Sequence, residues 1–239
     1  MDKHYPLVNK LVNLFNLRER LSKIGIEGDE SFQRPFITVG REPGSGGAPI
    51  AQAVAEKLGY EFVDEQIVEE IARSTKRRKE IIKEIDEKSR TKIEDIIHSV
   101  LNTEYVAEIE YVSELVRVIL AYAYKGRTVI LGRGANFITP FARGLHVNIM
   151  APYKVRVQRA MDFEGHSEQR AKEVIAKVEK ERADFVKQYF KKDVTKPNSY
   201  DMTINTTYYR VPEAREIIIT ALQQKFPGSG LVFPVAVKK

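Results

Sequence analysis

Residues 40–47 gather four glycines between an apolar run typical of a buried strand and a helical pattern. Glycines let backbone N–H groups approach a phosphate with no Cβ in the way, and the positive end of the following helix strengthens the attraction. We therefore predict that this loop binds the phosphates of a nucleotide. The alternative is a tight turn that only packs the helix on the sheet, for which fewer glycines would be enough. The predicted contacts come from Gly40, Pro43, Gly44, Ser45, Gly46, Gly47 and Ala48.

The loop lacks the cation of a standard P-loop, in which the last glycine is followed by lysine and then by serine or threonine. Here Gly46 is followed by Gly47, Ala48 and Pro49, so the lysine and the hydroxyl that assists Mg²⁺ are both missing. Either another cation replaces the lysine, or the loop binds nucleotide without catalysing. Arg41, within the same loop, is our candidate replacement. Its alternative is a surface ion pair with a neighbouring glutamate, worth at most about 1 kcal/mol.

Two further polar residues follow apolar runs that are typical of strands. Asp64 lies where ligands bind in parallel α/β folds, and the alternative is that it caps the helix that begins after it. Arg133 lies between Gly132 and Gly134. Its planar guanidinium suits a bidentate grip on a phosphate or carboxylate, and the alternative is a structural salt bridge.

Three arginines lie on two helical patterns that are separated by Gly165-His166-Ser167. Arg156 and Arg159 are three residues apart on the first pattern, and Arg182 lies on the second. Arginines on a closing lid would neutralise the charge that phosphoryl transfer spreads over the phosphate oxygens, and closure would exclude water. The alternative for each of them is a solvated helix residue.

Strand and helix patterns alternate along most of the chain. Strand candidates occupy residues 36–39, 60–63, 128–131, 145–150 and 202–206. Helical patterns occupy residues 49–58, nearly all of 65–125, 153–163, 168–191 and 212–224. Strands separated by helical crossovers predict an α/β fold, with a five-stranded parallel sheet and helices on both faces. Residues 1–33 carry leucines at helical spacing and predict a helical extension, and residues 226–239 predict a tail.

The composition predicts an intracellular protein. The 239 residues include no cysteine, which excludes disulfides and thiolate metal sites, and the four histidines are scattered, so we expect no metal centre. No stretch of about 18 apolar residues and no signal peptide is found, so we expect a cytoplasmic protein without membrane spans. The net charge of +6 suits anionic nucleotides and, alternatively, nucleic acid.

Five blocks, in order along the chain, resemble the cytidylate kinase-like family, a branch of the P-loop nucleoside monophosphate kinases. The blocks are Gly44-Ser45-Gly46-Gly47 preceded by Arg41, Phe62-Val63-Asp64, Gly132-Arg133-Gly134-Ala135-Asn136-Phe137-Ile138, residues 181–185 and residues 200–206. The resemblance covers about residues 35–225. It implies a fold of the P-loop kinase type with a helical NMP-binding insert at about 65–125 and a lid at about 153–192, within a domain of residues 34–225. It also implies a loop without lysine, although such relatives often carry an arginine where this chain has Ala48.

The favoured hypothesis is an ATP-dependent nucleoside monophosphate kinase that transfers the γ-phosphate of ATP to CMP or a similar nucleotide with Mg²⁺. The catalytic candidates are Arg41, Asp64, Arg133, Arg159 and Arg182, and Gly132 and Arg156 join the loop as nucleotide-binding candidates. By resemblance, Arg133 would hold the acceptor monophosphate. The sequence leaves open which monophosphate that is and which oligomer forms. One alternative is a catalytically inactive nucleotide-binding regulatory module, which the lysine-free loop favours. The other is a nucleic-acid-binding protein, which only the charge favours.

Overall fold

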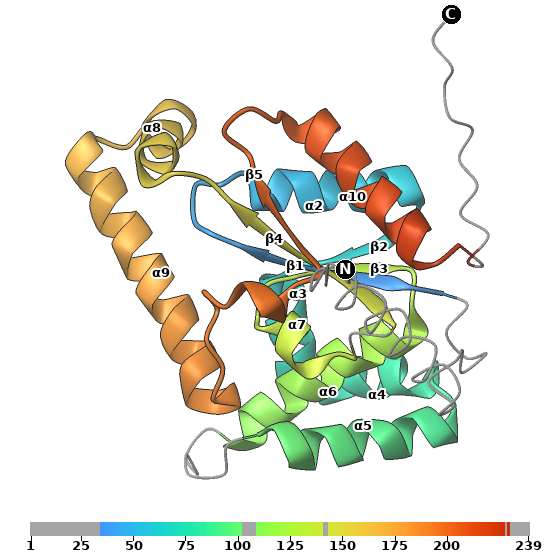
Figure 1. Cartoon of the computed structure of the whole chain (residues 1–239). Helices are drawn as coiled ribbons and strands as arrows, with labels where there is room; N and C mark the ends of the chain where they lie inside the picture. Colours follow the sequence, from blue (N-terminus) through green and yellow to red (C-terminus); the bar gives the residue numbers. More distant parts are fainter. Residues whose placement is uncertain (1–33, 102–108, 141–142, 228, 230–239) are drawn as a thin grey trace, which may run out of the picture. The chain divides into compact units, whose positions relative to one another are not determined.

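The computed structural model describes residues 34–101, 109–140, 143–227 and 229 (Figure 1). Five parallel strands form one sheet in the order β2-β3-β1-β4-β5, so the predicted sheet is confirmed. The strands are β1 (Phe36–Arg41), β2 (Glu61–Val63), β3 (Thr128–Leu131), β4 (Gly144–Met150) and β5 (Met202–Asn205). The predicted helical extension of residues 1–33 and most of the predicted tail lie outside the described residues.

Helices cover both faces of the sheet, as predicted (Figure 1). One face carries α2 (Gly47–Leu58) and α10 (Val211–Lys225), and the other carries α6 (Ile109–Lys125) and the short α7 (Ala135–Ile138). Between β2 and β3 the insert consists of α3 (Glu65–Arg73), α4 (Thr75–Lys83), α5 (Glu87–Val100) and α6. Between β4 and β5 lie α8 (Tyr153–Glu164) and α9 (Glu168–Phe190), followed by a 3-10 turn at Pro197–Ser199.

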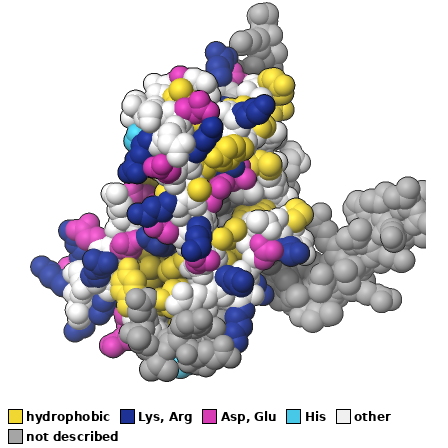
Figure 2. Space-filling model, turned by 90° about the vertical axis from the view of Figure 1, so that its left-hand side faces the viewer, with side chains coloured by type: hydrophobic (Ala, Val, Ile, Leu, Met, Phe, Trp, Pro, Cys, Tyr) yellow, Lys and Arg dark blue, Asp and Glu magenta, His cyan; other side chains and the backbone are white. Residues whose placement is uncertain are grey.

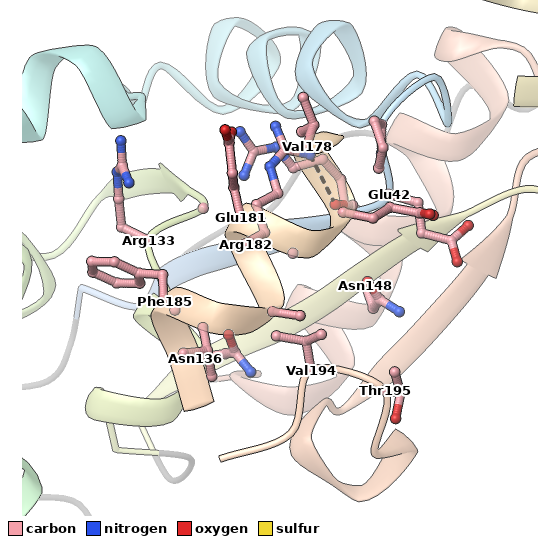
Figure 3. A pocket seen from close by; sticks show the side chains of 18 of the residues that line it. Glu42, Arg133, Asn136, Asn148, Val178, Glu181, Arg182, Phe185, Val194 and Thr195 are labelled. Atoms are coloured by element: carbon pink, nitrogen blue, oxygen red, sulfur yellow. Dashed lines mark hydrogen bonds between the residues drawn. The ribbon is translucent and has the colours of Figure 1, made fainter. Parts of the chain in front are cut away.

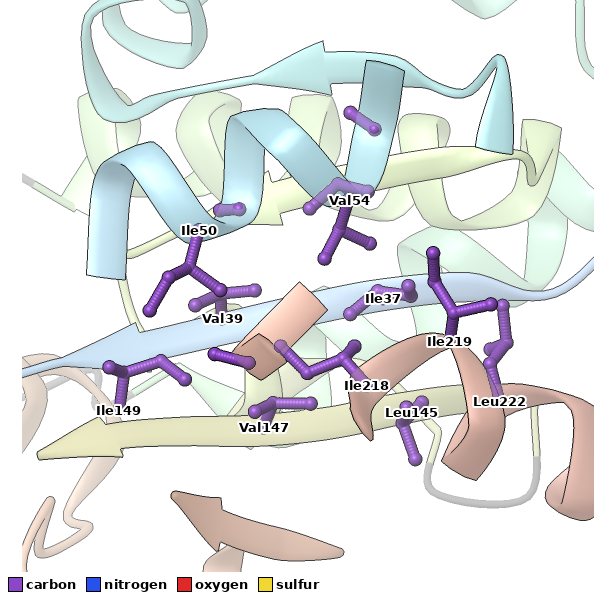
Figure 4. Close-up of a cluster of buried hydrophobic side chains, with 14 of the residues drawn as sticks. Ile37, Val39, Ile50, Val54, Leu145, Val147, Ile149, Ile218, Ile219 and Leu222 are labelled. Atoms are coloured by element: carbon purple, nitrogen blue, oxygen red, sulfur yellow. The ribbon is translucent and has the colours of Figure 1, made fainter. Parts of the chain in front are cut away.

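One hydrophobic core lies between the sheet and the layer of α2 and α10 (Figure 4). β1 is the central strand, and its apolar residues are buried because helices cover both of its faces. Ile50 and Val54 of α2 and Ile218 and Leu222 of α10 are each four residues apart, so each pair lies on one helix face and turns it to the sheet. All four side chains are at most 2% exposed. Burial of such a side chain contributes about 1.5–3 kcal/mol to the free energy of folding, and this core fixes the position of β1 and α2.

β1 is longer than its apolar run predicts. Gly40 and Arg41 continue the strand and pair with Asn148 and Ile149 of β4, because ladder pairing depends on the backbone and not on apolar side chains. The connection to α2 is therefore only residues 42–46, and the expectation that Arg41 lies within the loop is wrong. As a consequence, Arg41 stands on a rigid strand whose position the core fixes.

The face that carries α8 and α9 shows basic and acidic side chains interspersed, with hydrophobic side chains between them (Figure 2). On α9, Glu168 and Lys172 form an ion pair four residues apart, and Lys177 and Glu181 form another. Such alternation is typical of a solvated helix surface. Among the helices of the described residues, none is both long and apolar enough to cross a membrane.

Candidate functional site

The loop of residues 42–46 is shaped by two glycines and one serine. Gly44 and Gly46 have φ angles of 75° and 82°, a left-handed conformation that residues with side chains rarely adopt. Both the backbone N–H and the hydroxyl of Ser45 donate to the carbonyl oxygen of Glu42, at 3.2 and 2.8 Å, and close a tight turn. Ser45 is fully buried, so at this position the loop presents backbone rather than a side chain to a ligand.

The amino-terminal end of α2 carries backbone donors that no group of the described residues accepts from. Among the described residues, the N–H groups of Gly46, Gly47 and Ala48 have no acceptor. The positive end of the helix dipole lies at the same place, which favours an anion there. Such groups can bind a phosphate, and they belong to three of the residues that the sequence predicts for this role.

Arg156 of α8 is bound within the protein. It is 6% exposed, and its Nε donates to the carbonyl oxygen of Ala151 at 2.9 Å. Its Nη1 donates to the carbonyl oxygen of Pro43 at 3.4 Å and forms an ion pair with Glu179 of α9 at 2.6 Å. A Cβ on Gly44 would come within 2.8 Å of the Arg156 carbonyl oxygen, so glycine is required here for close approach to α8.

Arg159, one turn further along α8, also contacts the loop. Its Nη1 donates to the carbonyl oxygen of Ser45 at 3.1 Å, and its Nη2 donates to that of Thr206 at 2.7 Å. The hydroxyl of Thr206 donates to the same Ser45 oxygen at 2.7 Å. Arg159 therefore ties α8, the loop and the end of β5 together. A direct contact of Arg156 or Arg159 with nucleotide stays a prediction.

Asp64 caps α3. Its Oδ1 accepts hydrogen bonds from the backbone N–H groups of Gln66 and Ile67, at 3.0 and 2.9 Å, which satisfies two donors of the first helical turn. The helix-cap alternative is therefore what the structure shows, and a role of Asp64 in the chemistry stays a prediction.

A cavity of about 710 Å³ opens at the carboxyl ends of the central strands (Figure 3). α9 forms its wall, and the segment that leads to β5 closes its far end. Of the predicted site residues, the cavity is lined by Gly40, Arg41, Pro43, Gly132, Arg133 and Arg182. Three arginines from β1, the end of β3 and α9 are thus brought together, as the common edge of parallel strands predicts.

The side chain of Arg41 is positioned by the space that Gly132 leaves and by an ion pair with Glu65. Its side chain is 8% exposed, and its Nη2 forms an ion pair with Oε1 of Glu65 at 2.9 Å. A Cβ on Gly132 would collide with Nη1 of Arg41, so this glycine, with its φ of 83°, makes room for the guanidinium. The guanidinium therefore faces the cavity from the end of β1.

Arg182 and Arg133 complete a cluster of like charge. The Nη1 of Arg182 donates to the carbonyl oxygen of Arg41 at 3.3 Å, and its Nη2 lies 3.7 Å from Glu65. Burial, followed by the charge of Arg41, lowers the pKa of Arg182 to about 10. Arg133 forms an ion pair with Glu69, and its Cζ lies 5.5 Å from the ring centre of Phe185. Burial lowers the pKa of Arg133 as well.

Sequence reasoning missed several residues that line this cavity, among them Glu65, Asn148 and Tyr200. Glu65 follows Asp64 and reads as an ordinary acidic residue in a first helical turn. Asn148 and His146 are polar residues within the otherwise apolar β4, and that break in the pattern was the available signal. Among the described residues, the side-chain amide of Asn148 has no hydrogen-bond partner.

Comparison with known proteins places the chain in one family. The model of the family described as "Cytidylate kinase-like family" matches residues 36–208. An uncharacterized protein from Eubacterium ventriosum superposes with a TM-score of 0.55 at 21% identity, over 80% of this chain and 99% of that one, and this likeness supports the fold. A shikimate kinase from Bacteroides thetaiotaomicron aligns with a TM-score of 0.45 at 16% identity, over 79% of this chain and 98% of that one, too distant to bear on activity.

Among curated proteins, a uronate isomerase from Corynebacterium glutamicum is 29% identical over 107 residues. The match covers 44% of this chain and spans only 21% of that protein. A similarity over so short a part of the isomerase does not extend to its activity.

Proposed function

The chain belongs to the cytidylate kinase-like family, and we propose that it is a nucleoside monophosphate kinase that transfers the γ-phosphate of ATP to CMP or a similar nucleotide. One observation carries the proposal: Arg41, Arg133 and Arg182 converge on one cavity beside the N–H groups of residues 46–48, which have no acceptor in the part of the chain that the structure describes. Phosphoryl transfer needs little covalent chemistry from the protein, so positioning and positive charge are the main requirements. This site offers both.

Each group would have a distinct part. The N–H groups of Gly46, Gly47 and Ala48 would hold phosphates of ATP. Arg41 would replace the missing lysine, because it is the cation that stands at the end of β1, immediately before the loop. Arg133 and Arg182 would hold the acceptor phosphate and neutralise charge on the transferred group, and such donors are worth about 10²–10³ in turnover each.

Mg²⁺ would supply further charge neutralisation on the nucleotide phosphates when it is bound. The carboxylates next to the loop are already engaged. Glu42 accepts from the backbone N–H of Ala151 at 3.0 Å and lies 3.3 Å from Nε of Arg156. Asp64 caps α3. Mg²⁺ would therefore be held chiefly by phosphate oxygens and water.

α9 lines one side of this cavity, with apolar side chains (Val178, Phe185 and Val186) beside charged ones (Glu181 and Arg182). Water is a competing acceptor for the phosphoryl group, so transfer would require that the bound nucleotides displace water from this side of the cavity.

A second candidate is a nucleotide-binding regulatory module without turnover. One observation favours it: Glu65 pairs with both Arg41 and Arg182, and Glu69 pairs with Arg133, so each of the three cations already contacts a carboxylate. Ala48 also stands where a standard P-loop has a hydroxyl.

The test is a screen of nucleoside monophosphates with ATP and Mg²⁺ that detects ADP, run with and without each acceptor. Arg182→Ala is the site variant, and Arg170→Ala is its control, because Arg170 lies on the same helix with its side chain 64% exposed. We expect acceptor-dependent ADP release that Arg182→Ala reduces about 10²–10³-fold and Arg170→Ala leaves unchanged. Absence of acceptor-dependent release with every monophosphate, in a protein that ATP still stabilises, contradicts the kinase and supports the module.

A further inference from the structure

Glu65 connects three parts of the chain at the arginine cluster. It is the first residue of α3 in the insert, and its carboxylate contacts Arg41 on the central strand and Arg182 on α9. It lines the cavity, and its side chain is 33% exposed. A single carboxylate thus occupies the position where two guanidinium groups converge.

This arrangement is unusual for a helix-terminal glutamate. An acidic residue in a first turn normally stabilises its own helix by facing the unpaired N–H groups. In α3 that task is done by Asp64, so the carboxylate of Glu65 is available to other partners. Although burial of Glu65 raises its pKa, the charge and hydrogen bond of Arg41 and the charges of Arg182 and Arg133 lower it more, and the net pKa lies below its ordinary value. The carboxylate is therefore ionised at neutral pH and acts as a counter-anion.

We propose that Glu65 is an internal stand-in for a substrate phosphate: it holds Arg41 and Arg182 in their binding positions, and a phosphate group binds by displacing it. The inference rests on the proposed function in so far as the displacing group is a nucleotide phosphate. Oxygen atoms of phosphate and carboxylate both accept from guanidinium groups in the same bidentate manner, so one can replace the other.

Displacement makes Glu65 a specificity-determining residue. A carboxylate fixed in the fold has an effective concentration of about the millimolar range or more. A free carboxylate ligand forms no better contacts than Glu65 and is excluded, whereas a phosphate has more charge and a third oxygen that can reach Arg133. The site therefore selects acceptors with a terminal phosphate and rejects carboxylates of similar size.

The experiment measures binding of inorganic phosphate, acetate, CMP and ADP to the whole protein by calorimetry, at fixed ionic strength and without turnover. The variant is Glu65→Gln, which keeps the size of the side chain and removes its charge. The control is Glu181→Gln, because Glu181 lines the same cavity, undergoes the same charge change, is 62% exposed and has its ion-pair partner, Lys177, at 3.8 Å.

We expect Glu65→Gln to bind inorganic phosphate about ten- to a hundredfold more tightly than the wild type, since one charged hydrogen bond no longer has to be broken. Acetate, which the wild type rejects, should bind to this variant. Glu181→Gln should change the affinity for phosphate by no more than about twofold, since exposed charges are screened. Of CMP and ADP, the nucleotide whose affinity increases more in Glu65→Gln identifies which phosphate displaces Glu65.

Unchanged or weaker phosphate binding in Glu65→Gln would overturn the proposal, because it would mean that Glu65 only supports the arginines. An equal gain in Glu181→Gln would overturn it too, since the effect would then be general electrostatics. If Glu65→Gln does not fold, Glu65→Asp replaces it. The shorter carboxylate should compete less well for the arginines, so inorganic phosphate should bind to this variant severalfold more tightly than to the wild type. None of these outcomes depends on kinase activity, so failure of the proposed function would be seen separately.

Discussion

Two glycines at opposite ends of α2 allow the phosphate-binding loop to be tested against a matched control. Gly46 precedes the helix with a φ of 82°, and Gly59 follows it with a φ of 63°. A Cβ at either position would meet nothing within 4 Å. The variants Gly46→Ala and Gly59→Ala therefore impose the same kind of backbone strain on the same helix, and only one of them places a methyl group at the loop.

The sizes of both effects follow from this geometry. An alanine in the left-handed conformation costs about 1–2 kcal/mol, so each variant should lower the free energy of unfolding by about that amount. For a domain of this size, that is a fall in Tm of roughly 2–8 °C at 2–4 °C per kcal/mol. ATP at 100 times its Kd adds about 2.7 kcal/mol to the wild type, a rise in Tm of roughly 5–11 °C.

We expect thermal unfolding with and without ATP to separate the two variants. Gly59→Ala should be destabilised and still gain the full rise in Tm with ATP. Gly46→Ala should be destabilised by a similar amount and lose most of that rise, because its methyl group enters the space that the phosphate needs. A full response to ATP in Gly46→Ala would refute phosphate binding by the loop. An equal loss in both variants would show that strain in α2, and not contact with the loop, controls binding.

Three further outcomes are expected. Arg41→Ala should reduce turnover about 10²–10³-fold and Arg41→Lys should recover part of it, as steady-state kinetics would show; wild-type turnover in Arg41→Ala would assign the role of the missing lysine to another cation. Burial lowers the pKa of His146 to about 4. The contribution of its neutral form to stability is therefore complete above pH 6.5 and is lost as the pH falls towards 4. This contribution is at most about 3 kcal/mol. Urea unfolding at pH 7 and 4.5 should show that loss and His146→Gln should abolish it, so an equal loss in that variant would assign it to other groups. Amide exchange across residues 153–192 should slow when ATP and CMP bind together, and exchange that ignores both nucleotides would contradict a lid.

The strands and helices could be predicted closely because apolar periodicity reports burial. The run at residues 128–131 coincides with β3, and the helical pattern predicted at residues 49–58 ends where α2 ends, before Gly59. The end of β1 could not be predicted in the same way. Gly40 and Arg41 are added to the strand by pairing with β4, and that pairing depends on a partner more than 100 residues away.

The candidate site could be predicted only to the level of which strand ends meet. Arg41 is the last residue of β1, and Arg133 follows the neighbouring parallel strand β3, so their approach follows from topology. The role of Glu65 does not follow from the topology. Its contacts with Arg41 and Arg182 depend on side-chain conformations and on how α3 and α9 approach β1, and no local pattern encodes these.

The arginines of α8 show how a correct spacing argument can still miss the chemistry. Arg156 and Arg159 do share one helix face, and that face does meet the loop, but they bind the carbonyl oxygens of Pro43 and Ser45. In a trans peptide the C=O and the next N–H point in opposite directions. By drawing the Ser45 carbonyl towards α8, Arg159 therefore turns the N–H of Gly46 to the other side, where it has no acceptor among the described residues. Arg159 thus orients one of the proposed phosphate-binding donors through the backbone, whether or not it also reaches a nucleotide.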